Sequence, residues 1–393
     1  MNVLVANLGS TSFKYKLFAM AAGEKVLAEG AAERIGLAWG AWTFTPAQGE
    51  KLSGKTTLPD HDAAIQLHLD RLRRGGFLDG AAPVQAIGFK AVHGGPLEVA
   101  RVDERVLAVM QQFAAVAPQH NPPYIAAMRA FARHLPGVPQ VAAFETAFHR
   151  SIPRQRQAYA IPYEWMEKLG IRRYGFHGAS HRYIATRMKE LVPTARKIIS
   201  CHLGGSSSIC AIQDGQSVAN SFGMTAQSGL PQASRVGDFD TFALLKLLDS
   251  GLDWPAIWKK LGKESGLLGL SGVSSDCREV QAAADAGHAQ ARLALEVFVE
   301  AVRQYIGAYM AVLNGADAVV FTGGIGQHAA GLRGEVLKDF DYAGLMPDTV
   351  KNASARGEAR IDASGSRVQV WVLPTNEELI VARQTVEVLA KKT

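Results

Sequence analysis

One short pattern occurs twice in this 393-residue chain, and the two copies lie half a chain apart. Residues 3–18 read VLVANLGSTSFKYKLF, and residues 197–212 read KIISCHLGGSSSICAI. Each copy is an apolar run, a turn of glycine and serine, and a second apolar run. When the copies are overlaid, Asn7 falls on His202. The repeat predicts a duplicated α/β fold in two domains, with a ligand held between the copies.

The first copy has the small residues and the nearby lysine, Lys14, of a phosphate-binding loop. Nucleotide loops usually lead into a helix whose N-terminus helps to hold the phosphate. Here residues 13–17 alternate between apolar side chains and lysine, and a period of two is typical of a strand. The sequence therefore predicts phosphate-binding hairpins.

Length and composition narrow the class of protein. A chain with 48% hydrophobic residues, 20% charged residues and 39 glycines is typical of a soluble, two-domain α/β enzyme. The formal net charge of +6 is mild and scattered, which favours anionic ligands over nucleic acid. The three cysteines lack metal-binding spacing and indicate a reduced, cytoplasmic setting. No apolar run reaches the roughly 20 residues of a membrane span, and the sequence predicts no signal peptide.

Several other segments have clear secondary-structure patterns. Residues 291–313 are predicted to form a long helix that is apolar on more than one face. Residues 316–326 are predicted to be a strand that ends in a third glycine-rich turn, with a helix after it. Residues 45–57 indicate a hairpin or an exposed loop. Near the C-terminus a strand, a turn and an amphipathic helix follow, with Thr375 and Glu378 at the spacing of a capping box.

Two blocks are rich in polar residues that a core does not favour. Residues 172–181 hold two histidines around a glycine turn. Glu145 and His149 have the i,i+4 spacing of a helical metal pair, but no H-E-x-x-H motif or further carboxylate completes a zinc site. Histidines also lie beside glycine or proline turns at His93, His120, His177 and His202, where site residues tend to collect. One or two of these histidines are expected to be functional.

Taken in order, these motifs resemble those of the acetate kinases of the acetokinase family, within the sugar kinase, heat-shock and actin superfamily of ATPases. The resemblance covers nearly the whole chain. Its segments are the opening hairpin, AVHGG, RRYGFHGASH, CHLGG, FTGGIG and PTNEEL. It implies duplicated actin-like (ribonuclease H-like) α/β ATPase domains with an interdomain active-site cleft. The implied first domain is 1–149 plus 380–393, and the second is 150–379, which is expected to bind nucleotide and to form a homodimer.

The resemblance also implies a reaction, the transfer of the terminal phosphoryl group of ATP to a short carboxylate such as acetate. It implies that Asn7 and Glu377 hold Mg²⁺, with Mn²⁺ as a substitute, and amide and carboxylate oxygens suit such hard ions. Arg235 and His177 match residues that contact the phosphoryl group in transfer, and Glu145 matches the catalytic aspartate of the family.

Two further sets of site residues follow from the same match. The residues implied to bind the nucleotide and its phosphates are Ser10, Ser12, Lys14, His202, Leu203, Gly204, Gly205, Asp276, Cys277, Arg278, Gly324, Ile325, Gly326 and His328. The residues implied to bind the carboxylate are Lys90, Val92, Gln119, Phe176 and Ala226.

Some of these positions depart from the family pattern. Lys90 replaces an arginine, and it keeps the charge without the bidentate grip that a guanidinium has on a carboxylate. The other departures are Glu145 for aspartate, Gly205 for asparagine, Gln119 for leucine, Ala226 for proline, and His328 in the third turn.

An active acyl kinase is favoured over a degenerate site, because the implied metal and phosphoryl residues remain and the changes at Lys90 and Glu145 keep the sign of the charge. The substrate stays open between acetate, propionate and a hydroxy acid. A nucleotide-binding sensor of the same fold is the non-enzyme alternative. A hydrolase that uses water in place of the carboxylate is the third.

Overall fold

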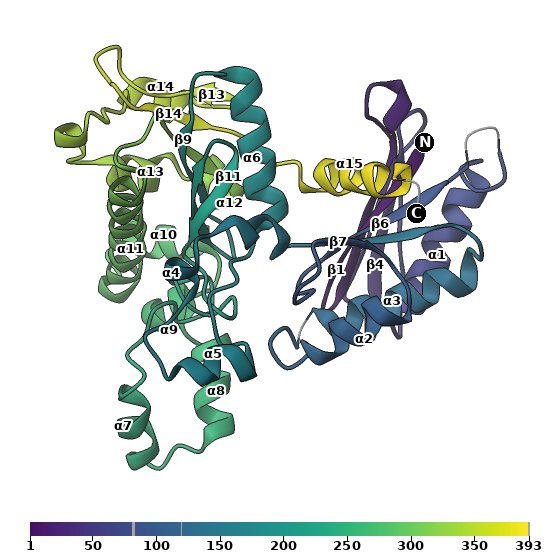
Figure 1. Ribbon diagram of the computed structural model, residues 1–393, viewed down its shortest axis with the longest axis horizontal. Coiled ribbons are helices and arrows are strands. Elements are labelled where there is room, and N and C mark those ends of the chain that lie inside the picture. Colours follow the sequence, from purple (N-terminus) through teal and green to yellow (C-terminus); the bar gives the residue numbers. More distant parts are fainter. Residues whose placement is uncertain (81–82, 119, 392–393) are drawn as a thin grey trace. The chain divides into compact units, whose positions relative to one another are not determined.

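The computed structural model describes residues 1–80, 83–118 and 120–391, and it contains two compact units (Figure 1). Unit 1 combines Met1–Phe148 with the C-terminal segment from Asn376, whereas unit 2 is the continuous segment His149–Thr375. Each unit has its own sheet and its own hydrophobic core. Gln119, which the sequence assigns to the carboxylate pocket, lies outside the described residues.

Unit 1 is built on an eight-stranded sheet in the order β5-β4-β3-β2-β1-β6-β8-β7. The first five strands form an antiparallel meander, and β6 and β8 run parallel to β1. The hairpin at residues 45–57 is thus confirmed as β4 and β5. The strands are β1 (Asn2–Gly9), β2 (Ser12–Ala19), β3 (Lys25–Glu33), β4 (Gly40–Pro46), β5 (Leu52–Thr56), β6 (Ala86–Ala91), β7 (Val99–Arg101) and β8 (Gln140–Phe144).

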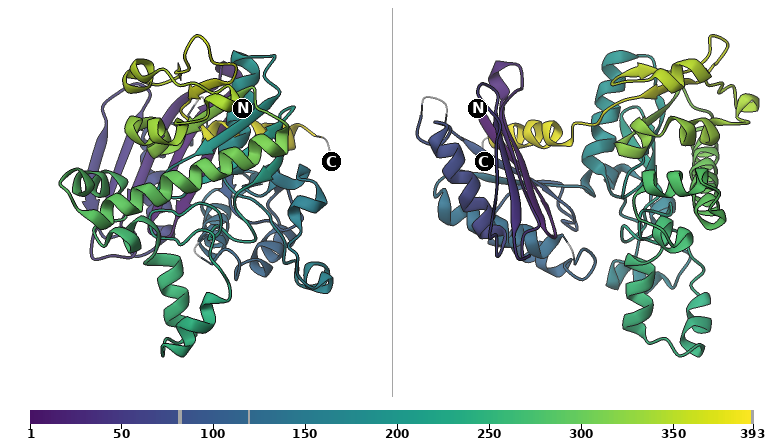
Figure 2. Two further views of the ribbon diagram at one scale, coloured as in Figure 1. Left: turned by 90° about the vertical axis from the view of Figure 1, so that its left-hand side faces the viewer. Right: turned by 180° about the vertical axis from the view of Figure 1, so that it is seen from behind.

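Helices cover both faces of this sheet, and the side chains of β1 point alternately to one apolar face and to the other. Leu4 and Leu8 belong to the core beneath α1 and α3, whereas Val3 and Val5 pack with α15 on the opposite face (Figure 2). Gly88 of β6 allows α15 to approach, because a Cβ there would lie 2.5 Å from the hydroxyl of a threonine in that helix. The helices are α1 (His61–Arg74), α2 (Glu104–Gln112), α3 (Asn121–His134) and α15 (Glu377–Ala390).

Unit 2 repeats the core of unit 1. Its six-stranded sheet has the order β11-β10-β9-β12-β14-β13. The run β11-β10-β9-β12-β14 matches β3-β2-β1-β6-β8 strand for strand, with the same antiparallel and parallel pairings. The predicted duplication is confirmed. The strands are β9 (Lys197–His202), β10 (Ser208–Gln213), β11 (Gln216–Asn220), β12 (Ala318–Thr322), β13 (Ala359–Arg360) and β14 (Gln369–Val372).

Helices cover both faces of the second sheet, with α11 on one side and α6 on the other (Figure 1). The long helix predicted at 291–313 is confirmed as α11. The helices are α4 (Arg154–Gln157), α5 (Tyr163–Leu169), α6 (Gly178–Leu191), α7 (Ala243–Asp249), α8 (Trp254–Lys263), α9 (Gly266–Ser271), α10 (Cys277–Asp285), α11 (Ala289–Leu313), α12 (Gly323–His328), α13 (Ala330–Leu337) and α14 (Thr349–Ser354). Across the described ranges, no helix is both long and apolar enough to cross a membrane.

Two local predictions are wrong. Helix α15 is capped by Asn376, whose side chain accepts a hydrogen bond from the backbone of Leu379 at 3.2 Å, so Thr375 is not the capping residue. Glu145 and His149 do not share an α-helix, because β8 ends at Phe144 and a turn and a short 3₁₀ helix follow. Within the described part of the chain, no cluster of three His, Cys, Asp or Glu residues has the geometry of a metal site.

Candidate functional site

In unit 1, a lysine lies between two carboxylates at the carboxyl ends of two parallel strands. Lys90 of β6 donates a hydrogen bond to Glu377, the first residue of α15, and its Nζ is 3.6 Å from Oε1 of Glu145. Glu145 directly follows β8, which runs parallel to β6, so the two strands end side by side. The side chains are only 18%, 6% and 11% exposed for Lys90, Glu145 and Glu377.

The charge on Lys90 is maintained by its neighbours. Burial alone would lower the pKa of Lys90, but the carboxylates of Glu377 and Glu145 outweigh it and raise the pKa above its ordinary value. The ammonium is therefore charged at neutral pH and offsets part of the negative charge of the two acids. The sequence had assigned these three residues to different roles, and unit 1 brings them together.

Two residues that the sequence did not assign to the site lie beside Asn7. The hydroxyl of Tyr124 accepts a hydrogen bond from the backbone of Leu8 at 3.0 Å and donates to Oδ1 of Asn7 at 3.4 Å. Nδ2 of Asn7 donates to Glu378 at 3.5 Å. Burial raises the pKa of Tyr124, so its hydroxyl stays protonated.

The oxygen atoms around Asn7 fit a magnesium ion. Mg²⁺ usually keeps several waters and takes only one or two carboxylates from the protein, with phosphate oxygens completing its shell. The amide of Asn7 and the carboxylate of Glu377 are donors of that kind, and the carboxylate of Glu378 lies 3.5 Å from Nδ2 of Asn7. Mg²⁺ therefore does not need three ligands from the protein.

The first hairpin has the predicted shape. Gly9 and Ser12 are paired across the turn between β1 and β2, and a Cβ at Gly9 would lie 2.6 Å from the hydroxyl of Ser12. Ser10 is exposed in the turn. Lys14 extends to the surface, where its Nζ is 3.3 Å from Glu33. Val92 follows β6 and packs against the core of this unit.

In unit 2, Arg235 lies against the second hairpin. Its guanidinium donates to Gln232 at 3.1 Å, to the carbonyl of Ala226 at 3.2 Å and to the hydroxyl of Ser206 at 3.4 Å. Gln232, which the sequence did not indicate, also bonds Ser206 and Ala226 at 2.8 Å each. Burial lowers the pKa of Arg235, but an arginine remains charged at any ordinary pH. Gln232 thus ties a cation to the turn that is predicted to hold phosphate.

The third glycine turn is the start of helix α12, and the second hairpin is hydrogen-bonded to it. The carbonyl of Leu203 accepts from Ile325 at 2.9 Å and from Gly326 at 3.0 Å. Gly323, which sequence reasoning missed, has a positive φ of 76° and lies so close that a Cβ would be 2.5 Å from the same carbonyl. Only glycine fits this position.

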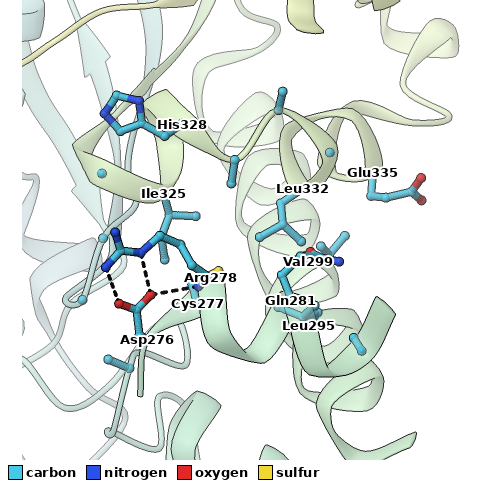
Figure 3. Close-up of a pocket in the computed structure, with 18 of the residues that line it drawn as sticks. Asp276, Cys277, Arg278, Gln281, Leu295, Val299, Ile325, His328, Leu332 and Glu335 are labelled. Carbon is cyan, nitrogen blue, oxygen red and sulfur yellow. Dashed lines mark hydrogen bonds and ion pairs between the residues drawn. The ribbon is translucent and has the colours of Figure 1, made fainter. Parts of the chain in front are cut away.

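A cavity of about 1550 Å³ opens beside these two turns (Figure 3). Asp276 and Arg278 form an ion pair at 2.5 Å on one side, near His328 and Ile325, while Leu332 lies on the other side. The hydrogen bond from Arg278 lowers the pKa of Asp276 to about 2. The predicted nucleotide-binding residues that line the cavity are Gly204, Gly205, Asp276, Cys277, Arg278, Gly324, Ile325 and His328.

Histidines form the third part of the site in unit 2. His177 precedes α6 and has a left-handed backbone, with φ of 55°. Its ring stacks on that of His202, with centroids 4.2 Å apart. His181 and His149 lie next to them in the core. Phe176 packs edge-on against a phenylalanine at 5.7 Å, within the same unit.

The profile of the acetokinase family matches residues 2–383. This chain belongs to the acetokinase family. A relative named acetate kinase, from Halothermothrix orenii, is 41% identical over 99% of this chain and 100% of its own length. Two solved structures are also similar over nearly their full length. One is an acetate kinase from Porphyromonas gingivalis, with 37% identity, 99% coverage of both chains and a TM-score of 0.90. The other is a propionate kinase from Francisella tularensis, with 34% identity, coverage of 98% and 99%, and a TM-score of 0.92.

Membership of the acetokinase family relates the residues of unit 2 to one another, but it does not explain why histidines are buried there. Burial lowers the pKa of His149 from 6.5 to about 4, so its imidazole is neutral in the folded protein and protonates more readily in the unfolded chain. Between these two pKa values the unfolded state binds more protons.

We therefore expect the free energy of unfolding to fall as the pH drops from 6.5 towards 4, by up to about 1.4 kcal/mol per pH unit from this one group. Urea unfolding at pH 7 and pH 5 tests this. The variant His149→Gln should have a shallower pH dependence than the wild type, and an equal slope would show that His149 does not titrate between the two states.

Proposed function

We propose that this protein is an acetate kinase, which transfers the γ-phosphoryl group of ATP reversibly to acetate and so forms acetyl phosphate and ADP. The observation that carries the proposal is the full-length match to relatives of that name. It is supported by the cavity in unit 2, which gathers eight of the residues expected to bind nucleotide.

Within this proposal, unit 2 binds the nucleotide. The apolar wall formed by Ile325 and Leu332 suits a purine ring, and the hairpin glycines let phosphates approach the backbone. Arg235 and His177 contact the phosphoryl group in transfer, where fixed N–H groups stabilise the charge on its equatorial oxygens. Gln232 and Ser206 hold the guanidinium in place for this task.

Unit 1 supplies the groups for the carboxylate and the metal. Lys90 provides the positive charge for acetate, Val92 contacts the acyl chain, and Glu145 sets the orientation of Lys90. Asn7 and Glu377 are the proposed magnesium ligands, and Tyr124 fixes the amide of Asn7. Mg²⁺, when bound, neutralises part of the charge on the phosphates.

Propionate is the second candidate substrate. It is favoured by the similarity to a propionate kinase at a TM-score of 0.92, and by the small side chain of Ala226 where the family has proline. An apolar pocket separates substrates that differ by one methylene by only about 1–3 kcal/mol. Acetate remains the proposal.

The function is tested by trapping acyl phosphate as a hydroxamate from ATP and Mg²⁺ with acetate, propionate, butyrate, lactate and glycolate in parallel. The highest kcat/KM with acetate, and its loss on chelation by EDTA, would support the proposal. A higher value with another acid would reassign the substrate. ATP hydrolysis that does not depend on carboxylate would indicate a hydrolase, and ATP binding without turnover would indicate a sensor.

We also infer a cytoplasmic homodimer in which unit 2 carries the contact. The three cysteines are buried and unbridged, which suits a reducing compartment. Large apolar side chains are exposed around α7, α8 and α11, with Phe242 78% and Trp258 62% exposed, and burial against a second copy would remove them from water. Sedimentation equilibrium gives the mass directly, and a monomer at micromolar concentration would contradict the dimer.

A further inference from the structure

Every histidine in the cluster of unit 2 has a serine hydroxyl at its Nδ1. The cluster consists of four rings that contact one another, and the four serines come from three strands and from α6. All four serines are fully buried. The pairs are His149–Ser217 at 2.8 Å, His177–Ser208 at 2.8 Å, His181–Ser200 at 2.9 Å and His202–Ser180 at 2.8 Å.

The backbone explains why these pairs form. His177 precedes α6, and Ser180 and His181 follow it by three and four residues, so each lies about one helical turn from His177. Ser208 of β10 is the cross-strand partner of His202 of β9, so both side chains leave the sheet on the face that α6 covers. Helix α6 therefore supplies Ser180 for His202 of β9, and β9 supplies Ser200 for His181 of α6, whereas β10 contributes only a serine.

The position of the proton is settled for His149. Its Nε2 is 2.8 Å from the carbonyl oxygen of Phe176, and a carbonyl oxygen can only accept. Nε2 must therefore carry the proton, and Nδ1 accepts from the hydroxyl of Ser217. This ring shows the arrangement that a serine at Nδ1 supports, a neutral imidazole with its N–H at Nε2.

A chain of three hydrogen bonds links His177 to the core. The hydroxyl of Ser208 lies 2.8 Å from Nδ1 of His177 and 2.9 Å from Nε2 of His181, and Nδ1 of His181 lies 2.9 Å from the hydroxyl of Ser200. Burial lowers the pKa of His181 well below its ordinary value, so this ring is neutral and has one N–H. If Ser208 accepted from both rings, its own proton would need another acceptor, and the described residues offer this hydroxyl none. The three protons therefore run in one direction or the other along the chain.

The buried hydroxyl of Ser200 selects between them. If His181 donated from Nδ1, the proton of Ser200 would need another acceptor, and among the described residues Ser200 has no other side-chain hydrogen bond. A buried hydroxyl without an acceptor is costly. Ser200 therefore donates to His181, Nε2 of His181 donates to Ser208, and Ser208 donates to Nδ1 of His177.

We propose that Ser208 is a positioning residue that holds His177 as the Nε2–H tautomer, so that the ring turns an N–H donor toward the phosphoryl group. The inference rests on the proposed function for the phosphoryl group beside His177. In the opposite tautomer His177 would turn a lone pair to the phosphoryl oxygens and repel them. In the same way, the hydroxyl of Ser180 donates to Nδ1 of His202 and leaves the proton of that ring on Nε2. His202 is then a second N–H donor, and its ring stacks on that of His177.

The test is the variant Ser208→Ala, with Ser217→Ala as its control. The control also removes a buried hydroxyl from Nδ1 of a histidine, but Ser217 serves His149 and does not touch His177. The ring nitrogens of His177 are observed by ¹⁵N NMR of histidine-labelled protein, with the signal assigned by its loss in His177→Gln. We expect the Nε2–H pattern in the wild type and in Ser217→Ala, and a mixture of tautomers in Ser208→Ala.

The kinetic readout is a mutant cycle. Ser208→Ala should lower kcat roughly tenfold, which is less than the 10²–10³-fold cost of deleting a donor outright, with little change in the KM for ATP. In the His177→Gln background the same substitution should have no further effect on kcat, since Ser208 acts through His177. A full second loss of kcat in that background would overturn the proposal, as would a wild-type ring with its proton at Nδ1. The NMR result stands without turnover, so failure of the proposed function is recognised separately by the acyl phosphate assay.

Discussion

Replacing Arg235 with alanine is expected to lower kcat for acyl phosphate formation by at least about 10³-fold, because a fixed guanidinium stabilises charge that is largest in the transition state. The affinity for ATP should change little, since the cavity that is proposed to bind the nucleotide is lined by other residues. The variant Arg235→Lys keeps the charge without the fork, and we expect it to recover only part of the lost rate.

Because Arg235 also hydrogen-bonds Gln232 and Ala226, its loss affects local structure as well as charge. Nucleotide affinity and the melting temperature separate the two effects. Arg196, which pairs with Asp214 on the surface, offers a control, and Arg196→Ala should leave kcat unchanged. If Arg235→Ala retained more than a tenth of the wild-type kcat with normal stability, the phosphoryl group would have to lie elsewhere.

Replacing Lys90 with methionine is expected to lower the free energy of unfolding of unit 1 by about 3 kcal/mol, because it removes the cation between two nearly buried carboxylates. The loss should appear as a shift in the urea midpoint of that unit. The surface lysine Lys259, paired with Glu264 at 2.6 Å, is the matched control, and Lys259→Met should scarcely move any midpoint.

A second substitution makes this test specific. In the double variant Lys90→Met with Glu377→Gln, one of the stranded charges is removed, so more than half of the lost stability should return. Strictly additive losses would show that Lys90 and Glu377 do not depend on each other. Neither variant is expected to make acyl phosphate at the wild-type rate, since both residues belong to the proposed site.

The repeated hairpins were predictable from the sequence because a two-residue period is a local property. Residues 13–17 alternate, and the strand that they predict is β2. The interval of four between Glu145 and His149 does not identify a helix, because a single pair of residues defines no period. Both residues follow a strand that ends at Phe144. The cap of α15 is similar, because Thr375 and Asn376 are both good capping residues and only the backbone selects Asn376.

The residues that sequence reasoning missed act over long separations. Tyr124 reaches Leu8 and Asn7 from another part of the chain, and Gln232 joins Ala226 to Ser206 across a loop. Neither has a local pattern that distinguishes it from an ordinary helix or loop residue. Gly323 is visible in the sequence as the first glycine of a pair. The sequence does not show why glycine is needed there, because the reason is a nearby carbonyl of the second hairpin.

The assignment of α15 to unit 1 has a consequence for the order in which the protein matures on the ribosome. Val3 and Val5 are synthesised long before the helix that covers them, which begins at Glu377. Unit 2 is one continuous segment and can reach its final form while this apolar face of β1 still lacks its cover. The N-terminal unit is therefore expected to be the later of the two to acquire resistance to protease, and the nascent chain needs protection there until residues 377–390 have emerged.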